Sequence, residues 1–179
     1  YDRALEAVTL GAGGLLERLG EGGVHVSLST VAPATARRLA DAHAARGSAY
    51  LAAPVFGRPE AAAAGKLWGV ISGPEAAKAR LIPLIPLIGQ GHYDFGTAAD
   101  AANVVKVAGN FLIASAIEGL GEALALAAKN GIDPSDIARF FGETIFGCSV
   151  YRGYGAQIAE RRFEPAGFRL ALGLKDVNL

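Results

Sequence analysis

The chain has 179 residues, of which 51% are hydrophobic and 19% are charged, so it is long enough to bury a sizeable core. Its 17 basic and 17 acidic side chains cancel, and this zero net charge argues against nucleic acid and against an acidic membrane surface as partners. The single cysteine, Cys148, excludes an internal disulfide and any zinc site with several cysteines, and it fits a reducing cytoplasm. His25, His43 and His92 lie far apart in the sequence and show no metal-ligand spacing.

No targeting or membrane segment is expected. Each apolar run of about twenty residues contains a charge, so the sequence predicts no membrane span. Nothing has the pattern of a secretory signal peptide. The chain starts on Tyr1 and stops within an unfinished helical pattern, so we expect both ends of the natural chain to be missing.

Strands and helices alternate over residues 1–95. A helix and its loop are expected at 1–20, and the glycines there lack the spacing of a phosphate-binding turn. Residues 24–28 predict a strand, after which Ser29 or Thr30 could cap a helix that begins at Pro33. This strand–turn–helix unit is typical of open parallel sheets, which bind ligands beyond the carboxyl ends of their strands.

The rest of this half predicts three further strands and one helix. The link between the second and third strands is short for a helical crossover, so we expect antiparallel neighbours or a side excursion there. The expected strands cover 49–53, 66–72 and 93–95; a turn-rich loop covers 54–59, and a helix distorted by its prolines runs from 74 to about 88.

Residues 96–130 form the longest predicted element, a proline-free helix rich in Ala, Leu, Glu and Lys. Asn103, Lys106 and Asn110 share one face of it through spacings of three and four. A lysine in apolar surroundings loses solvation, which lowers its pKa toward neutrality and makes it a candidate proton donor and acceptor. Spacing alone favours the simpler interpretation, in which Lys106 extends its amine to solvent.

Only helices are expected after this element, so the composition divides the chain into three parts. Residues 1–95 are expected to form an α/β domain, 96–130 a long interdomain helix, and 131–179 an incomplete helical domain. A pocket is expected between the domains, close to Lys106. Further helices are predicted from 133 through 141, from about 150 to 161, and from about 165 onward.

Four segments, taken together and in order, resemble the β-hydroxyacid dehydrogenases, the family of 3-hydroxyisobutyrate, tartronate-semialdehyde and 6-phosphogluconate dehydrogenases. No single segment is specific, but this order and spacing over essentially the whole chain overturns the solvent-exposed interpretation of Lys106. The segments are the Ser-Thr-x-x-Pro turn at 29–33, the substrate loop at 53–58 with 63–67 behind it, the catalytic Lys-x-x-x-Asn at 106–110, and Phe168 with the Lys-Asp motif at 174–176.

The resemblance implies a Rossmann-type NAD(P)-binding domain followed by an all-α domain, usually paired in a homodimer. It implies an enzyme that transfers a hydride between NADH or NADPH and a small 3-hydroxy acid or semialdehyde, and the lone cysteine leads us to expect it in the cytoplasm. Lys106 would be the general acid in reduction and the base in oxidation, and its charge would stabilise the developing alkoxide. Asn110 would bind the substrate, and Thr30 and Lys175 would contact the cofactor.

The substrate loop departs from the family pattern. Phe56-Gly57-Arg58, which would line the acid-binding site, stands where Ser-Gly-Gly is usual. Arg58 could restore carboxylate binding, or the substrate could be a less polar carbonyl or an imine. Imine reductases share this architecture but commonly lack the lysine, so Lys106 favours carbonyl chemistry and Phe56 keeps the imine alternative open.

Four further points follow from the sequence and the resemblance. The nucleotide fingerprint Gly-x-Gly-x-x-Gly is absent, and we expect it to precede Tyr1, which hides the NAD-versus-NADP determinant. Asp100 occupies a position before the catalytic lysine at which the family commonly has glycine. Its carboxylate could interact favourably with the helix N-terminus, or it could enter the pocket. The helix at 111–128 is apolar nearly all round, so we expect a partner subunit to cover it. A non-catalytic cofactor-binding scaffold is the least favoured alternative, because Lys106 and Asn110 are both present.

Overall fold

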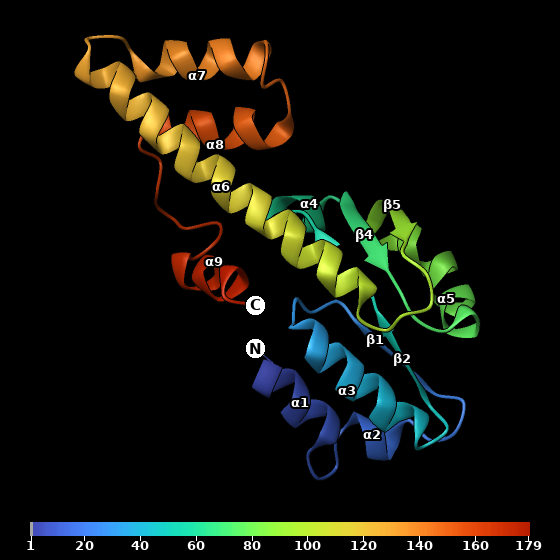
Figure 1. Ribbon diagram of the computed structural model, residues 1–179. Helices are drawn as coiled ribbons and strands as arrows, with labels where there is room; N and C mark the ends of the chain where they lie inside the picture. Colours follow the sequence, from blue (N-terminus) through green and yellow to red (C-terminus); the bar gives the residue numbers. More distant parts are fainter. Residues whose placement is uncertain (1) are drawn as a thin grey trace. The chain divides into compact units, whose positions relative to one another are not determined.

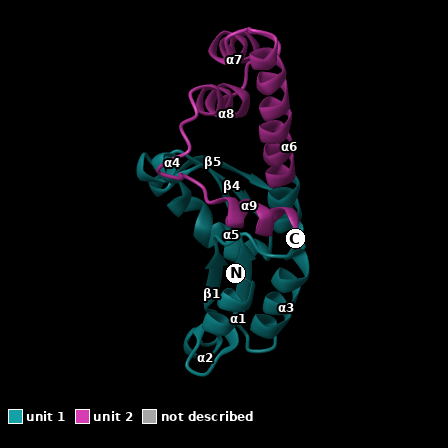
Figure 2. Cartoon of the chain, turned by 90° about the vertical axis from the view of Figure 1, so that its left-hand side faces the viewer, with its two compact units in different colours: residues 1–108, 179 teal, residues 109–178 magenta. Residues whose placement is uncertain are grey.

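The computed structural model describes residues 2–179, which fall into two compact units (Figures 1 and 2). Unit 1 comprises residues 1–108 with Leu179, and unit 2 comprises residues 109–178. The boundary lies inside the long helix α6 (Ala101–Lys129) rather than near Gly96. The first turns of this helix belong to unit 1 because Ala102 is part of the core there.

Unit 1 is an α/β unit with helices before, between and after its strands. Its elements are α1 (Asp2–Leu10), α2 (Leu15–Arg18), β1 (Val24–Ser27), α3 (Pro33–Ala44), β2 (Ala49–Ala52), β3 (Val55–Phe56), α4 (Pro59–Ala63), β4 (Leu67–Ile71), α5 (Glu75–Leu81), the 3₁₀ helix η1 (Ile82–Leu87) and β5 (Gly89–Asp94). The expected strand–turn–helix unit is confirmed, and so is the distorted end of the helix with Pro83 and Pro86, which the structure turns into η1.

The strands form two small sheets. β1 and β2 are parallel, as the crossover helix α3 requires. β4 lies between β3, which is antiparallel to it, and β5, which is parallel. An isolated antiparallel bridge between Ala52 and Ser72 joins the two sheets. The expected antiparallel excursion is therefore present, but the sequence prediction missed β3 and α4, because both are short and lie in a segment rich in turn residues.

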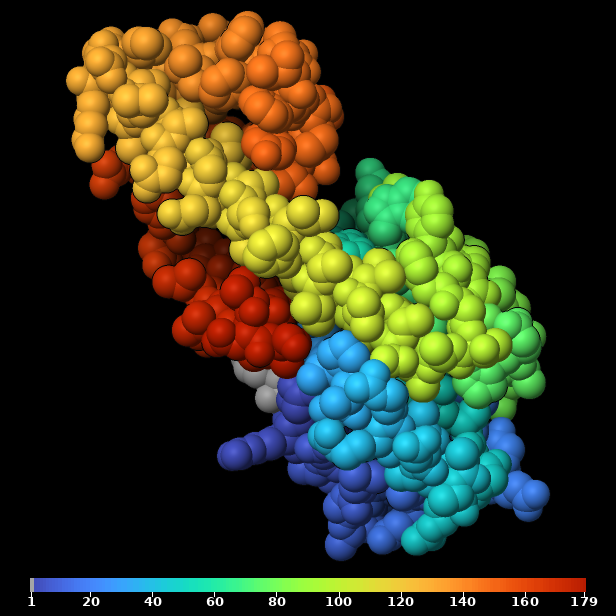
Figure 3. Space-filling view, viewed as in Figure 1, coloured from blue at the N-terminus to red at the C-terminus, as the bar shows by residue number. Residues whose placement is uncertain are grey.

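Two buried clusters cover opposite faces of β2. Tyr50 and Ala52 point to one face, where they pack with residues of α3, β4 and α6. Leu51 and Ala53 point to the other, where they pack with α5 and η1. This division follows from the period of two along a strand, which sends successive side chains to opposite faces. Figure 3 shows the outer surface of α3 (light blue) in contact with the beginning of α6 (yellow-green).

Two buried histidines join this core. His25 of β1 and His43 of α3 are 3.1 Å apart through Nδ1 and Nε2, and His43 Nδ1 lies 2.8 Å from the Ser48 hydroxyl. The ring of Tyr50 packs edge-on against His25. Burial and the neighbouring His43 lower the pKa of His25 to about 4, and burial also lowers the pKa of His43.

Unit 2 is helical. It contains the remainder of α6 with α7 (Pro134–Glu143), α8 (Ser149–Ala159) and α9 (Leu170–Val177). The carboxylate of Asp133 accepts a hydrogen bond from Ser135 N at 2.8 Å, which confirms the expected cap of α7. The last helix was predicted to begin near Pro165, but it begins at Leu170, five residues later.

By length and composition alone, α6 could cross a membrane, contrary to the sequence prediction. The core helix of a soluble protein passes the same test. Leu120 and Leu124 are buried, and Leu120 lies beside Gly155 of α8. Part of α6 is thus packed inside unit 2, although only 22% of its apolar window is buried in the single chain.

Candidate active site

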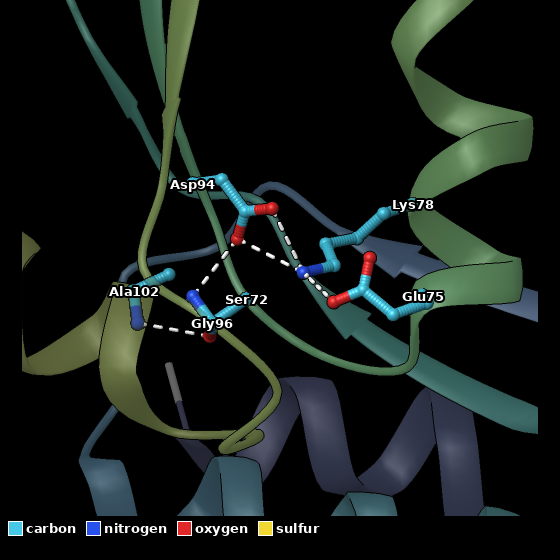
Figure 4. A network of polar contacts seen from close by, with 6 residues as sticks. All are labelled: Ser72, Glu75, Lys78, Asp94, Gly96 and Ala102. Atoms are coloured by element: carbon cyan, nitrogen blue, oxygen red, sulfur yellow. Dashed lines mark hydrogen bonds and ion pairs between the residues drawn. The ribbon is translucent and has the colours of Figure 1, made fainter.

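The beginning of α6 is fixed by buried polar side chains at the carboxyl ends of strands. Ser72, which follows β4 and is fully buried, accepts a hydrogen bond from Ala102 N at 2.9 Å (Figure 4). This satisfies one of the backbone N–H groups that every helix N-terminus leaves without a partner inside the helix. Ser72 is itself held by backbone hydrogen bonds in both directions with Ala52.

A second network supports the loop between β5 and α6. Lys78 of α5 is buried and donates to both carboxylate oxygens of Asp94, at 3.0 and 2.8 Å, and it also pairs with Glu75 at 2.6 Å (Figure 4). Asp94 in turn accepts from Gly96 N at 2.8 Å. The hydrogen bonds from Lys78 lower the pKa of Asp94, and those to Asp94 and Glu75 raise the pKa of Lys78. The chain therefore enters α6 along a fixed path.

Asn103 joins α6 to the turn after β1. It is fully buried, and its Nδ2 donates to the carbonyl oxygens of Ser29 and Val31 at 3.3 and 3.4 Å. These two residues flank Thr30, so Asn103 holds the backbone on both sides of the predicted cofactor contact. Its Oδ1 is also buried and has no hydrogen-bond partner among the residues that the structure describes.

Lys106 lies one turn after Ala102 and Asn103, and it is only 9% exposed. Its Nζ is 4.0 Å from the centre of the Phe56 ring. The face of an aromatic ring is negative, so it is a favourable neighbour for an ammonium group. The solvent-exposed interpretation of Lys106 is therefore wrong, and β3 and α6 bring Phe56 and Lys106 together although fifty positions separate them.

The predicted substrate loop has a constrained backbone after Phe56. Gly57 has φ +138°, and a Cβ placed there would lie 2.6 Å from Leu67 Cδ2. Only glycine fits this position without strain. Arg58 is the N-cap residue of α4 and contributes no side-chain cap. The loop is therefore a short, specific turn that leaves Phe56 next to Lys106.

Two expectations about neighbouring residues are answered by the structure. Neither Ser29 nor Thr30 caps α3, because Ala32 is the N-cap residue and no side chain caps the helix. The capping interpretation was wrong, and Thr30 lies half-buried in the turn between β1 and α3. Asp100 forms an ion pair with Arg37 of α3, so its charge is directed to that helix.

In unit 2, Asp176 links the two predicted site residues. Asn110 Nδ2 donates to Asp176 Oδ2 at 2.7 Å, and Lys175 forms an ion pair with the same carboxylate. Asp176 is 6% exposed. The predicted residues thus divide between the units: Thr30, Phe56, Gly57, Arg58 and Lys106 lie in unit 1, and Asn110 and Lys175 lie in unit 2.

Sequence reasoning missed the supporting roles of Ser72, Asn103 and Asp176. Asn103 had a signal, since it is a polar residue on the same helix face as Lys106, and Asp176 belongs to the Lys-Asp motif. Ser72 had none, because a serine after a strand has no distinctive pattern. In the described part of the chain, no group of three or more His, Cys, Asp or Glu residues could hold a metal ion.

The sequence matches two family models that together cover the chain. The NAD binding domain of 6-phosphogluconate dehydrogenase matches residues 1–109. The NAD-binding domain of NADP-dependent 3-hydroxyisobutyrate dehydrogenase matches residues 100–179. The first of these models alone covers more than half of the chain.

Named relatives agree with these matches. An uncharacterized oxidoreductase of Bacillus subtilis, YfjR, is 42% identical over 99% of this chain and 62% of its own length. A 3-hydroxyisobutyrate dehydrogenase of Pseudomonas aeruginosa is 34% identical over 98% of this chain and 60% of its own length. The chain therefore spans about three-fifths of the length of these relatives.

A solved structure shares the fold. The crystal structure of a 3-hydroxyisobutyrate dehydrogenase from Salmonella typhimurium superposes with a TM-score of 0.87 at 24% identity, covering 99% of this chain and 61% of that protein. At this identity, the likeness establishes the fold alone: a Rossmann-type domain followed by a helical domain.

Proposed function

Because the chain belongs to the β-hydroxyacid dehydrogenase family, we propose that it is part of an oxidoreductase acting on a small hydroxy acid, semialdehyde or related carbonyl, with NADH or NADPH. The observation that carries the proposal is Lys106, a buried lysine at the family's catalytic position whose amine is held against Phe56. The Pseudomonas aeruginosa relative, named a 3-hydroxyisobutyrate dehydrogenase, supports this substrate class.

The residues of unit 1 fit the nicotinamide end of such a cofactor. Open parallel sheets bind ligands beyond the carboxyl ends of their strands, and Thr30 follows the carboxyl end of β1. The buried Oδ1 of Asn103, without a partner among the described residues, is a hydrogen-bond acceptor beside that turn. When bound, the nicotinamide supplies or accepts the hydride. Thr30 and Lys175 are the proposed cofactor contacts.

The chain's own residues would handle the proton. In reduction, Lys106 Nζ donates a proton to the substrate oxygen as charge develops on it, and in oxidation it takes the proton back. In reduction, before the proton is transferred, the positive ammonium group stabilises the negative charge that develops on the substrate oxygen. Phe56 covers one side of the amine and keeps water from it.

The remaining residues would bind the substrate. Asn110 hydrogen-bonds it, and Asp176 orients the Asn110 amide through the 2.7 Å bond. Gly57 and Arg58 lie in the loop after Phe56, where the guanidinium of Arg58 is suited to a carboxylate.

The test is nicotinamide absorbance with the full-length protein that contains this chain. NADH and NADPH are each tested with glyoxylate, succinic semialdehyde, methylmalonate semialdehyde and a cyclic imine. Replacing Lys106 by Ala should lower kcat by about 10²-fold or more, as expected for a general acid, while cofactor affinity stays within about two-fold. Lys129→Ala, at the end of the same helix, is the matched control and should retain activity.

Comparable turnover by the Lys106→Ala variant would remove the assigned role. An imine reductase is the second candidate, because Phe56 replaces the usual hydroxyl beside Lys106. Turnover of the cyclic imine but of none of the aldehyde acids would favour it. Cofactor binding without turnover of any of these compounds would instead favour the non-catalytic scaffold.

We also propose a cytoplasmic homodimer with small-molecule substrates. Phe111, Leu112 and Leu126 of α6 are exposed in the single chain, and a second copy of the protein would cover such apolar side chains. Light scattering of the full-length protein should report twice the chain mass, and a monomer mass would refute the dimer.

A further inference from the structure

Three aromatic side chains lie on one face of the β3–β4–β5 sheet. Phe56 is paired directly with Trp68, and Val70, two residues further along β4, is paired with Tyr93. Directly paired residues point to the same side of a sheet, and so do residues two apart on one strand. Phe56, Trp68 and Tyr93 therefore share a face, which we call the aromatic face.

The ring of Trp68 lies flat along the sheet rather than standing up from it. Gly91 is its partner on β5, and a Cβ at Gly91 would come within 2.5 Å of Trp68 Cζ3. The absence of that Cβ lets the indole cover the strand and reach Tyr93, at 5.8 Å between ring centres. Trp68 remains 42% exposed and Tyr93 63% exposed, so one side of each ring is open.

The aromatic face begins at the proposed catalytic amine. Phe56 meets Lys106 Nζ at 4.0 Å, and in antiparallel strands the Cα atoms of a directly opposed pair are about 5 Å apart, which puts Trp68 next in line. Among the strand residues that the structure describes on this face, namely Phe56, Trp68, Val70, Gly91 and Tyr93, none is charged. A substrate whose reacting oxygen meets Lys106 would thus have an apolar surface within reach of its substituent, where the family pattern expects a serine hydroxyl.

We propose that the substrate carries an aryl or similarly bulky apolar substituent, and that Phe56 and Trp68 select it. This inference rests on the proposed oxidoreductase function and names its substrate class. A flat apolar group stacks on exposed indole and phenyl rings, gaining contact area and favourable ring geometry. A methyl group, the substituent of 3-hydroxyisobutyrate, is too small to cover both rings.

The test compares two alcohols that differ only in this substituent, 3-hydroxy-2-phenylpropanoate and 3-hydroxyisobutyrate, with NAD⁺ and NADP⁺ and the full-length protein. The phenyl compound should have a kcat/KM at least about ten-fold higher, on the scale of one aromatic contact. Trp68→Ala should remove most of this preference, because kcat/KM should fall much further for the phenyl compound, which stacks on the ring, than for the methyl compound. Trp68→Phe should retain most of it.

Fluorescence gives a readout that is independent of turnover. Trp68 is the only tryptophan of the chain. The tryptophan fluorescence that is present in the wild type and absent in Trp68→Phe therefore comes from the aromatic face. Adding 3-hydroxy-2-phenylpropanoate without cofactor should change that signal to saturation. Leu84→Ala, which removes an exposed apolar side chain from η1, is the control and should alter neither the preference nor the signal.

The outcomes separate this inference from the proposed function. Lysine-dependent oxidation of both alcohols without a phenyl preference would overturn the inference and leave the oxidoreductase standing. A saturable signal without turnover of either alcohol would support the aromatic face as a binding surface and count against the assigned reaction. A Trp68 signal that no alcohol changes, because another part of the protein or a second copy covers the ring, would also overturn the inference.

Discussion

Lowering the pH from 7 to 5 should destabilise unit 1 through His25. This histidine is buried against His43 and Tyr50, and its pKa in the folded protein is about 4, compared with 6.5 when it is free of its surroundings. Below pH 6.5, the unfolded chain therefore binds a proton at this position that the folded chain does not. Stability is present in full above pH 6.5 and is lost as the pH falls toward 4.

The size of the effect follows from the two pKa values. The whole interval from 6.5 to about 4 corresponds to about 3 kcal/mol of unfolding free energy. Between pH 7 and pH 5, integrating the proton linkage gives a loss of about 2 kcal/mol from His25 alone. The pKa of His43 is lowered as well, so its contribution has the same sign. Keeping the pH at 5 or above avoids most of the titration of carboxylates.

The assay is urea denaturation followed by the fluorescence of Trp68, which belongs to unit 1, at several pH values between 7 and 5. His25→Gln is neutral throughout this range, so the unfolding free energy of the variant should depend less steeply on pH, even if the variant is less stable at pH 7. Tyr50→Phe keeps the ring of the cluster and serves as the control that should retain the wild-type slope.

Two results would refute this reasoning. One is a wild-type unfolding free energy that changes by less than about 0.5 kcal/mol over this range, well below the linkage value. The other is a His25→Gln variant with the same pH dependence as the wild type, which would assign the slope to other groups.

Three further substitutions test the support of the site. Ser72→Ala leaves Ala102 N buried without its acceptor and should lower the unfolding free energy by about 1–3 kcal/mol in urea denaturation, whereas Ser72→Thr should lose less. Gly57→Ala forces a side chain toward Leu67 at a positive φ and should lower the free energy of unfolding by about 1–3 kcal/mol. The same variant should raise the substrate KM and leave the cofactor affinity unchanged. Asn103→Leu removes both hydrogen bonds to the turn around Thr30 and should raise the Kd for NADH by about ten-fold, measured by nucleotide fluorescence; an unchanged Kd would contradict that role.

The sequence identified the parts of the fold that depend on local patterns. The strand at 24–28, the helix that follows Pro33 and the long helix through Lys106 all appear close to their expected positions. Asp133 caps α7 as expected, because a cap depends on residues within one turn of each other. Short elements such as β3 and α4 were missed, since two to five residues are too few to show a period.

The candidate site divides in the same way. The Lys-x-x-x-Asn motif and the Ser-Thr-x-x-Pro turn are readable along the chain, and they pointed to the family. Which side chains surround Lys106 was not readable: the ring of Phe56 reaches it from β3, and Asn103 joins its helix to the turn after β1. His25 and His43, two of the three histidines that looked unrelated in sequence, lie 3.1 Å apart in the core.

By itself, the sequence determined the longer elements and their order, and it determined the four family motifs, because each of these is set by residues within a few positions of one another. The four motifs in order then identified the proposed catalytic lysine. Only the tertiary structure decided that Lys106 is buried, that Asp100 pairs with Arg37, that Asp176 holds Asn110, and that Phe56, Trp68 and Tyr93 share a face. These contacts join positions far apart in the chain. They exist because strand register and helix packing place them together, and that placement depends on the whole core rather than on any local pattern.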